Sequence, residues 1–169
     1  RAVADAGDIA MPRVVTVAVL ALLAAAGCRQ RPAPVRVGFV TGLTGRHYDL
    51  GVSSRNGATL AVADVNQAGG VDGRPIELLV VDDEQRPESA QRAVEHLIRE
   101  GVVAIIGHAT SAMAEATLPI VNRERVLMLS PTVSSSVFVG LDDWFFMLHP
   151  STAESARVLA SYLLRTGPI

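Results

Sequence analysis

The sequence predicts an α/β fold, a doubly wound and mostly parallel sheet with helices on its faces. Strand-like apolar runs and helical patterns alternate four times after residue 35. Such alternation is typical of parallel sheets joined by right-handed crossovers. One run, at residues 102–106, is short, apolar and rich in β-branched residues between two glycines, as in a strand buried on both faces.

The expected elements follow each other along residues 35–169. A capping box, with Ser151 as the N-cap and Glu154 at the N3 position, predicts where the last helix begins. Strands are expected at 35–40, 76–81, 102–106, 126–129 and 144–147, and helices at 51–68, from 87 to just before Gly101, from 111 to about 121, and at 152–165. Apolar residues share one face in three helices: Leu60, Ala61, Val65 and Ala68; Ala90, Ala93, Val94, Leu97 and Ile98; and, expected to point inward, Ala156, Leu159, Ala160 and Leu163.

Composition excludes several classes of function. The chain has 169 residues, a net charge of −2, 4% aromatic residues and no lysine, and its arginines are scattered, which argues against a nucleic-acid partner. A P-loop needs a lysine, and a dinucleotide site needs a G-x-G-x-x-G after the first strand; both are missing. A nucleotide-using enzyme is therefore disfavoured.

The first 34 residues have the pattern of an export signal and not of a folded segment. Residues 1–10 precede Met11; Arg13 and the apolar stretch 14–24 then lead to Ala-Ala-Gly before Cys28. This is the layout of a secretory signal peptide that ends in a bacterial lipobox, so residues 1–28 are expected to be upstream sequence and signal, with Cys28 lipid-modified. A transmembrane anchor and a plain secreted protein are the alternatives. Residues 29–34 are expected to be a tether.

Two turns rich in hydroxyl groups follow neighbouring strands, at Thr110–Ser111 and at residues 130–134. Parallel strands place such turns on one rim of the sheet, where ligands of open α/β folds bind. Ser111 is placed to cap a helix whose N-terminal N–H groups and partial positive charge suit a carboxylate. In the alternative interpretation, Ser111 only caps its own helix and the other serines only make turns.

The remaining polar residues predict no chemistry. Asp82 and Asp83 are expected to be a solvated strand end or a helix cap. The four histidines have no metal-ligand spacing. His108 and Ser111 lack the G-x-S-x-G elbow and the third orienting group of a hydrolase. We therefore predict a protein that is not an enzyme and has no cofactor and no metal.

Five blocks occur in an order that resembles a known family: residues 39–45, 57–62, 66–74, 81–83 and 129–131. Together they resemble the leucine/isoleucine/valine-binding type of periplasmic binding protein, the solute receptors of branched-chain amino acid ABC importers. The resemblance runs from about residue 35 to the end. It implies a type 1, Rossmann-like lobe, truncated because the second lobe of the family is missing from residues 35–169.

The resemblance also implies a ligand site and partners. By position, Ser111 would contact a ligand carboxylate, Thr132 and Ser134 would contact carboxylate and ammonium, and Tyr48 would line the pocket. Ala109 and Thr110 share this rim.

The expected function is an exported, lipid-anchored solute-binding protein that binds an amino acid between two lobes and delivers it to an ABC permease. The alternative is a ligand-sensing domain coupled to a signalling partner. Residues 146–148 and Thr152 depart from the family pattern. With half of the contacts in this chain, weak or undetectable binding is expected.

Overall fold

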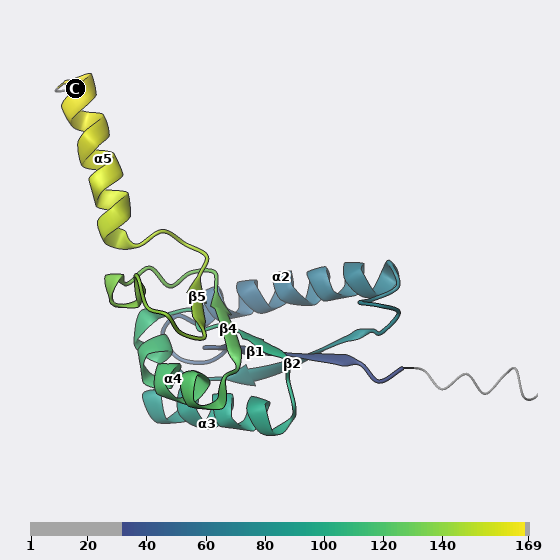
Figure 1. The fold of residues 1–169 in the computed structure, drawn as a ribbon. Helices are drawn as coiled ribbons and strands as arrows, with labels where there is room; N and C mark the ends of the chain where they lie inside the picture. Colours follow the sequence, from purple (N-terminus) through teal and green to yellow (C-terminus); the bar gives the residue numbers. More distant parts are fainter. Residues whose placement is uncertain (1–31, 168–169) are drawn as a thin grey trace, which may run out of the picture. The chain divides into compact units, whose positions relative to one another are not determined.

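The computed structural model describes residues 32–167 (Figure 1). Within them, five strands form one parallel sheet in the order β2-β1-β3-β4-β5, which confirms the predicted fold class. The expected signal at 1–28, with Cys28, and the tether up to residue 31 lie outside the described residues. In chain order the elements are β1 (Val35–Thr41), α2 (Tyr48–Gln67), β2 (Ile76–Asp82), α3 (Pro87–Arg99), β3 (Ala104–Ile106), α4 (Ser111–Glu124), β4 (Leu127–Ser130), the 3₁₀ turn η1 (Ser136–Phe138), β5 (Phe145–Met147) and α5 (Thr152–Thr166).

The main core lies between the sheet and the layer formed by α3 and α4, while α2 lies on the opposite face (Figure 1). Gly38 of β1 lets α3 approach, because a Cβ there would lie 2.9 Å from Cδ1 of Leu97. The stripe predicted on α3 is confirmed, since Ala90, Ala93, Val94 and Leu97 are buried and Ile98 is half-buried. Burial of this face is what stabilises the helix.

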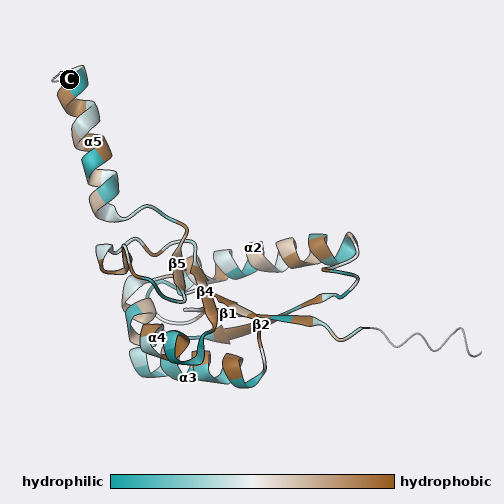
Figure 2. Ribbon diagram, in the orientation of Figure 1, coloured by the Kyte–Doolittle hydropathy of each residue, from teal (hydrophilic) through white to brown (hydrophobic). Residues whose placement is uncertain are grey.

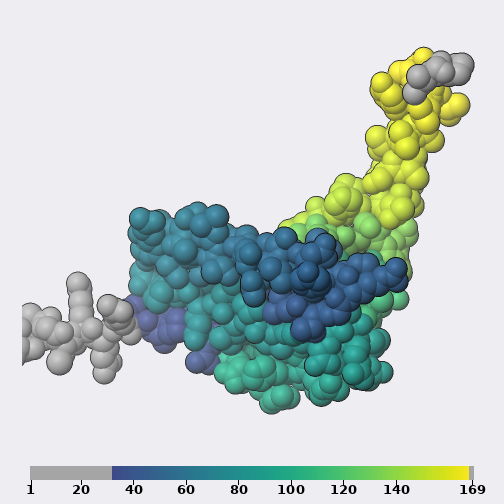
Figure 3. All heavy atoms as spheres, turned by 180° about the vertical axis from the view of Figure 1, so that it is seen from behind, coloured from purple at the N-terminus to yellow at the C-terminus, as the bar shows by residue number. Residues whose placement is uncertain are grey.

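The apolar faces of α2 and α5 are exposed. Hydrophobic residues line the strands, and further ones lie on α2 and α5 (Figure 2). On α2 both Leu60 and Val65 are exposed, and Figure 3 shows this helix at the surface. The expectation that Ala156, Leu159, Ala160 and Leu163 point inward is wrong, because no residue of α5 is buried and no described segment covers it. Among the helices of residues 32–167, none is long and apolar enough to span a membrane.

The start of α5 follows the sequence prediction. Ser151 is the N-cap, and its side-chain oxygen accepts a hydrogen bond from the backbone N–H of Glu154 at 3.1 Å. This confirms the predicted cap, which satisfies one of the free N–H groups of the first turn. Of the predicted strand at 102–106, only Ala104–Ile106 is paired, and Val103 is 62% exposed.

Candidate functional site

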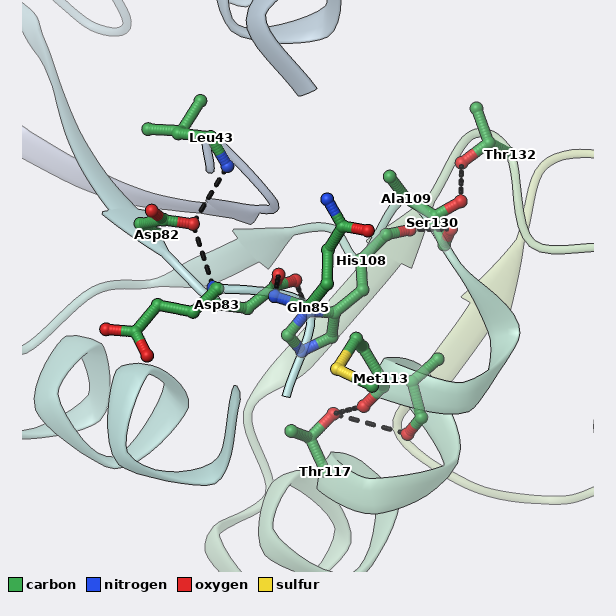
Figure 4. A network of polar contacts seen from close by, with 12 residues as sticks. Leu43, Asp82, Asp83, Gln85, His108, Ala109, Met113, Thr117, Ser130 and Thr132 are labelled. Atoms are coloured by element: carbon green, nitrogen blue, oxygen red, sulfur yellow. Dashed lines mark hydrogen bonds and ion pairs between the residues drawn. The ribbon is translucent and has the colours of Figure 1, made fainter. Parts of the chain in front are cut away.

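The loop between β3 and α4, residues 107–110, is fixed against the end of β4 by three hydrogen bonds. Gly107 donates its N–H to the carbonyl of Leu129 at 2.9 Å. The Ser130 hydroxyl donates to the carbonyl of His108 at 2.8 Å, and the Thr132 hydroxyl donates to the carbonyl of Ala109 at 3.0 Å (Figure 4). The two hydroxyl-rich turns are therefore neighbours, as the parallel topology predicts.

Gly107 is the residue that lets this loop pass close to β1. Its φ is +142°, and a Cβ at this position would lie 2.1 Å from the carbonyl oxygen of Val40. A residue with a side chain would therefore meet both an unfavourable backbone conformation and a backbone atom that cannot move aside. The glycine at the end of the third strand sets how near the loop lies to the sheet.

The N-terminus of α4 differs from the prediction by one residue. Thr110 is the N-cap, with extended backbone (φ −125°, ψ 147°), and Ser111 is the first helical residue, so the expectation that Ser111 caps this helix is wrong. Thr110 makes no side-chain cap, and the first turn holds no acidic residue. The N–H groups of this turn therefore keep their partial positive charge available to an outside acceptor.

A shallow depression with room for about one water molecule lies between the ends of β1 and β3 and the turn after β4. Its polar lining comes from the hydroxyl residues Thr41, Ser54 and Thr132, from His108, and from backbone, and no Asp, Glu or Arg lines it. A second depression, too narrow to hold a water molecule, is lined by Gly42, His47, Asp83, Gln85, Ala109 and Thr110. Ala109 lines both depressions, so the β3–α4 loop separates them.

The predicted ligand residues divide into two groups. Ala109 and Thr132 line the first depression and Thr110 the second, whereas Ser111, Ser134 and Tyr48 line neither. Ser134 is engaged with α5, because its carbonyl accepts from the N–H of Thr152 at 2.8 Å and its hydroxyl from the Thr152 hydroxyl at 3.3 Å. Tyr48 begins α2 and is 57% exposed. The ligand contacts of all six residues stay predictions.

Two hydroxyl residues that line the first depression were missed by the sequence analysis. Thr41 ends β1 and is 1% exposed, and among the described residues its hydroxyl has no hydrogen-bond partner. Ser54 reaches the depression from the first half of α2. The available signal was that Thr41 directly follows the strand predicted at residues 35–40, since polar residues after a strand also pointed to Thr110. No pattern in the sequence singles out Ser54.

The acidic pair at the end of β2, Asp82 and Asp83, does not consist of two solvated carboxylates. Asp83 is 1% exposed, so the expectation that it is solvated is wrong; its Oδ2 lies 2.7 Å from Nδ1 of His108. Its burial follows from the sheet order, because β2 and β3 flank β1 and their ends face each other across it.

Asp82 holds the turn after β1. It accepts hydrogen bonds from the N–H groups of Leu43 and Glu84 at 2.8 Å and from the Thr44 hydroxyl at 2.7 Å. Burial raises the pKa of this carboxyl, but the hydrogen bonds from the Thr44 hydroxyl and from the backbone of Glu84, Leu43 and Thr44 outweigh it and hold the pKa below its ordinary value of 3.8. Within residues 32–167 no cluster of three or more His, Cys, Asp or Glu side chains is arranged to hold a metal ion.

A family model described as periplasmic binding protein matches residues 34–168. The chain belongs to the periplasmic binding protein family. This confirms the family to which the five sequence blocks pointed. The fold agrees, since the sheet and its helices match one lobe of solved members of the family.

Curated relatives carry names of amino-acid-binding proteins. The Leu/Ile/Val-binding protein homolog 3 of Brucella melitensis is 27% identical over 135 residues, which is 79% of this chain and 36% of that protein. The Leu/Ile/Val-binding protein of Escherichia coli is 28% identical over 101 residues, which is 60% of this chain and 28% of that protein. This chain therefore spans about a third of the length of the curated relatives it matches.

Solved structures of substrate-binding proteins are similar to this chain as well. The branched-chain amino acid transporter substrate-binding protein LivJ from Streptococcus pneumoniae, in complex with isoleucine, is 26% identical with a TM-score of 0.70, covering 77% of this chain and 38% of that one. An ABC transporter substrate-binding protein from Desulfitobacterium hafniense, in complex with Leu, is 29% identical with a TM-score of 0.70, covering 79% of this chain and 39% of that one.

Proposed function

We propose that this chain is the first lobe of an extracytoplasmic solute-binding lipoprotein of an ABC importer, which binds an amino acid or a similar small carboxylate in a cleft between two lobes. The observation that carries the proposal is a rim of neutral polar groups, formed by Ala109, Thr110, Thr132 and the N-terminus of α4, which we call the neutral rim. A carboxylate bound there would accept hydrogen bonds from backbone N–H groups and hydroxyls without a charged side chain.

The charges of this lobe support a site in which the first lobe binds the carboxylate of the ligand and the second lobe binds its ammonium group. An α-amino acid also carries an ammonium group, which needs an acidic or carbonyl partner. Asp83 is buried against His108, and Asp82 already accepts three hydrogen bonds in its turn. Neither carboxylate is free to receive the ammonium, so its partner would come from the second lobe, which the resemblance to the family implies.

Other parts of the proposal rest on the family and on the N-terminal sequence. Membership of the periplasmic binding protein family supports a location outside the cytoplasm. The apolar stretch before Cys28 supports export and a lipid anchor on that cysteine. The names of the relatives support delivery of the ligand to the permease of an ABC importer, a role that involves no catalysis.

The proposal is tested with ligand-observed NMR on the 169-residue chain, using L-leucine, L-isoleucine and L-valine in large excess. We expect weak binding that falls in both the Ser111→Ala and the Thr132→Val variant. The first loses a hydroxyl at the predicted carboxylate position, and the second loses the hydrogen bond that holds the Ala109 carbonyl. Ser135→Ala is the matched control, since this hydroxyl only accepts from the N–H of Val137 in η1. Equal weakening of binding in the control and in the two variants would contradict the proposed site. Tight binding of an amino acid by this chain alone would contradict a site that is shared between two lobes.

A further inference from the structure

We propose that Asp83 and His108 form a positioning pair that fixes the β3–α4 loop in the conformation the ligand requires. This inference rests on the proposed function, because it concerns the loop that carries Ala109 and Thr110. His108 lines the first depression and Asp83 the second, but both residues are almost fully buried, at 0% and 1% exposure. Their effect on binding would come through the backbone that follows His108.

The pair bridges three strands. Asp83 follows β2 and His108 follows β3, and the two strands lie on either side of β1. Oδ2 of Asp83 lies 2.7 Å from Nδ1 of His108 (Figure 4). The Asp83 N–H donates to the carbonyl of Thr41 at 3.0 Å. The end of β1 is thus tied to β2 through the backbone of Asp83, and β3 is tied to β2 through its carboxylate.

The carboxylate is itself held in place. Its Oδ1 accepts from the N–H of Gln85 at 2.9 Å. The side chain of Gln85 then reaches the loop after β1, where its Oε1 accepts from the N–H of His47 at 3.2 Å and its Nε2 donates to the carbonyl of Thr44 at 2.8 Å. Asp83 is therefore a fixed acceptor, because both of its oxygens are engaged and the residue that engages Oδ1 is anchored in turn.

The pair also selects one tautomer of His108. An ionised carboxylate only accepts hydrogen bonds, so Nδ1 of the imidazole carries the proton that it donates to Asp83. Nε2 is buried and has no partner in the part of the chain that the structure describes. A proton on Nε2 would be a buried donor without an acceptor, which is costly. The ring therefore has one favourable orientation and one favourable tautomer.

These constraints converge on the residues next to the neutral rim. The side chain of His108 is held by Asp83, its carbonyl by Ser130 and the following carbonyl by Thr132. Without the carboxylate of Asp83, the β3–α4 loop keeps its hydrogen bonds to Ser130 and Thr132 and loses its contact with the end of β2. The loop would then move relative to α4, and the N–H groups that face the ligand would lose their alignment.

The test compares Asp83→Asn and His108→Gln with the wild-type chain. Val94→Ala is the control, because it removes methyl groups from a fully buried residue of the α3 core and leaves the pair intact. In the free protein, ¹⁵N NMR of the imidazole is expected to show the Nδ1–H tautomer in wild type and in Val94→Ala. Backbone order parameters of residues 109–112 are expected to fall in Asp83→Asn and His108→Gln only.

The second readout is the initial slope of amide shift against L-leucine concentration at residues 109–112. We expect roughly a tenfold loss of slope in Asp83→Asn, the scale found when a supporting partner of a binding residue is removed. If Val94→Ala and Asp83→Asn have the same melting temperature and lose the same amount of slope, the role of the pair is merely structural and the proposal is overturned. The order parameters are measured without ligand, so unchanged values in both pair variants would refute the positioning role whether or not the single lobe responds to leucine.

Discussion

Replacing Gly107 by alanine is expected to destabilise the lobe strongly. The new Cβ would lie 2.1 Å from the Val40 carbonyl oxygen and 2.8 Å from Cγ1 of the same residue, at a backbone φ of +142°. A residue held in a glycine-type conformation costs about 1–3 kcal/mol, and overpacking costs about 1–3 kcal/mol more. The free energy of unfolding should therefore fall by roughly 2–6 kcal/mol, a large share of the roughly 5–15 kcal/mol typical of a domain.

Urea denaturation followed by circular dichroism measures this difference. Gly140→Ala is the matched control, because Gly140 also has a positive φ, of +77°, but a Cβ there would meet no atom within 4 Å. The control isolates backbone strain, which should cost about 1–2 kcal/mol. If the two variants lose the same stability, the close approach of the β3–α4 loop to β1 is not what requires glycine at position 107.

Three further variants test other contacts around the candidate site. Thr41→Val should raise the midpoint of urea unfolding, by about 1 kcal/mol of stability, because it removes a buried hydroxyl without a partner; a lower midpoint would contradict this. Ser130→Ala should cost about 1–3 kcal/mol, since this hydroxyl donates to His108 and accepts from the N–H of Val133, and no loss would show that these bonds are not needed. Because the pKa of Asp82 is lowered in the fold, its carboxylate stabilises the fold at pH values above its ordinary pKa of 3.8. This contribution disappears as the pH falls through the folded pKa. Melting temperature measured from pH 7 to pH 3 should therefore fall less steeply in Asp82→Asn than in wild type, and parallel curves would refute this.

Local patterns in the sequence were sufficient for much of the fold. The buried stripe of α3 and the Ser151 cap of α5 depend on residues three or four apart, so a short window contains all the information. The adjacency of the loops after β3 and β4 follows from parallel pairing, which the alternation of strands and helices predicts.

Contacts between distant segments could not be predicted in the same way. The burial of Asp83 depends on which strands flank β1, a fact of sheet order that no short window contains. The pattern on α5 predicts an apolar face but not the segment that would cover it, and within residues 32–167 no segment does. The cap at Thr110 and not Ser111 depends on the backbone angles of a single residue, which are set by the loop before it.

The most direct test of the neutral rim is a map of backbone amide shifts in the ¹⁵N-labelled chain on addition of L-leucine and, separately, of leucinol, which lacks the carboxylate. A carboxylate held by the N-terminus of α4 and the turn after β4 should shift the amides of residues 110–113 and 132–134 with leucine and leave them unchanged with leucinol. Equal shifts with both compounds, or shifts confined to other parts of the chain, would contradict carboxylate binding at this rim.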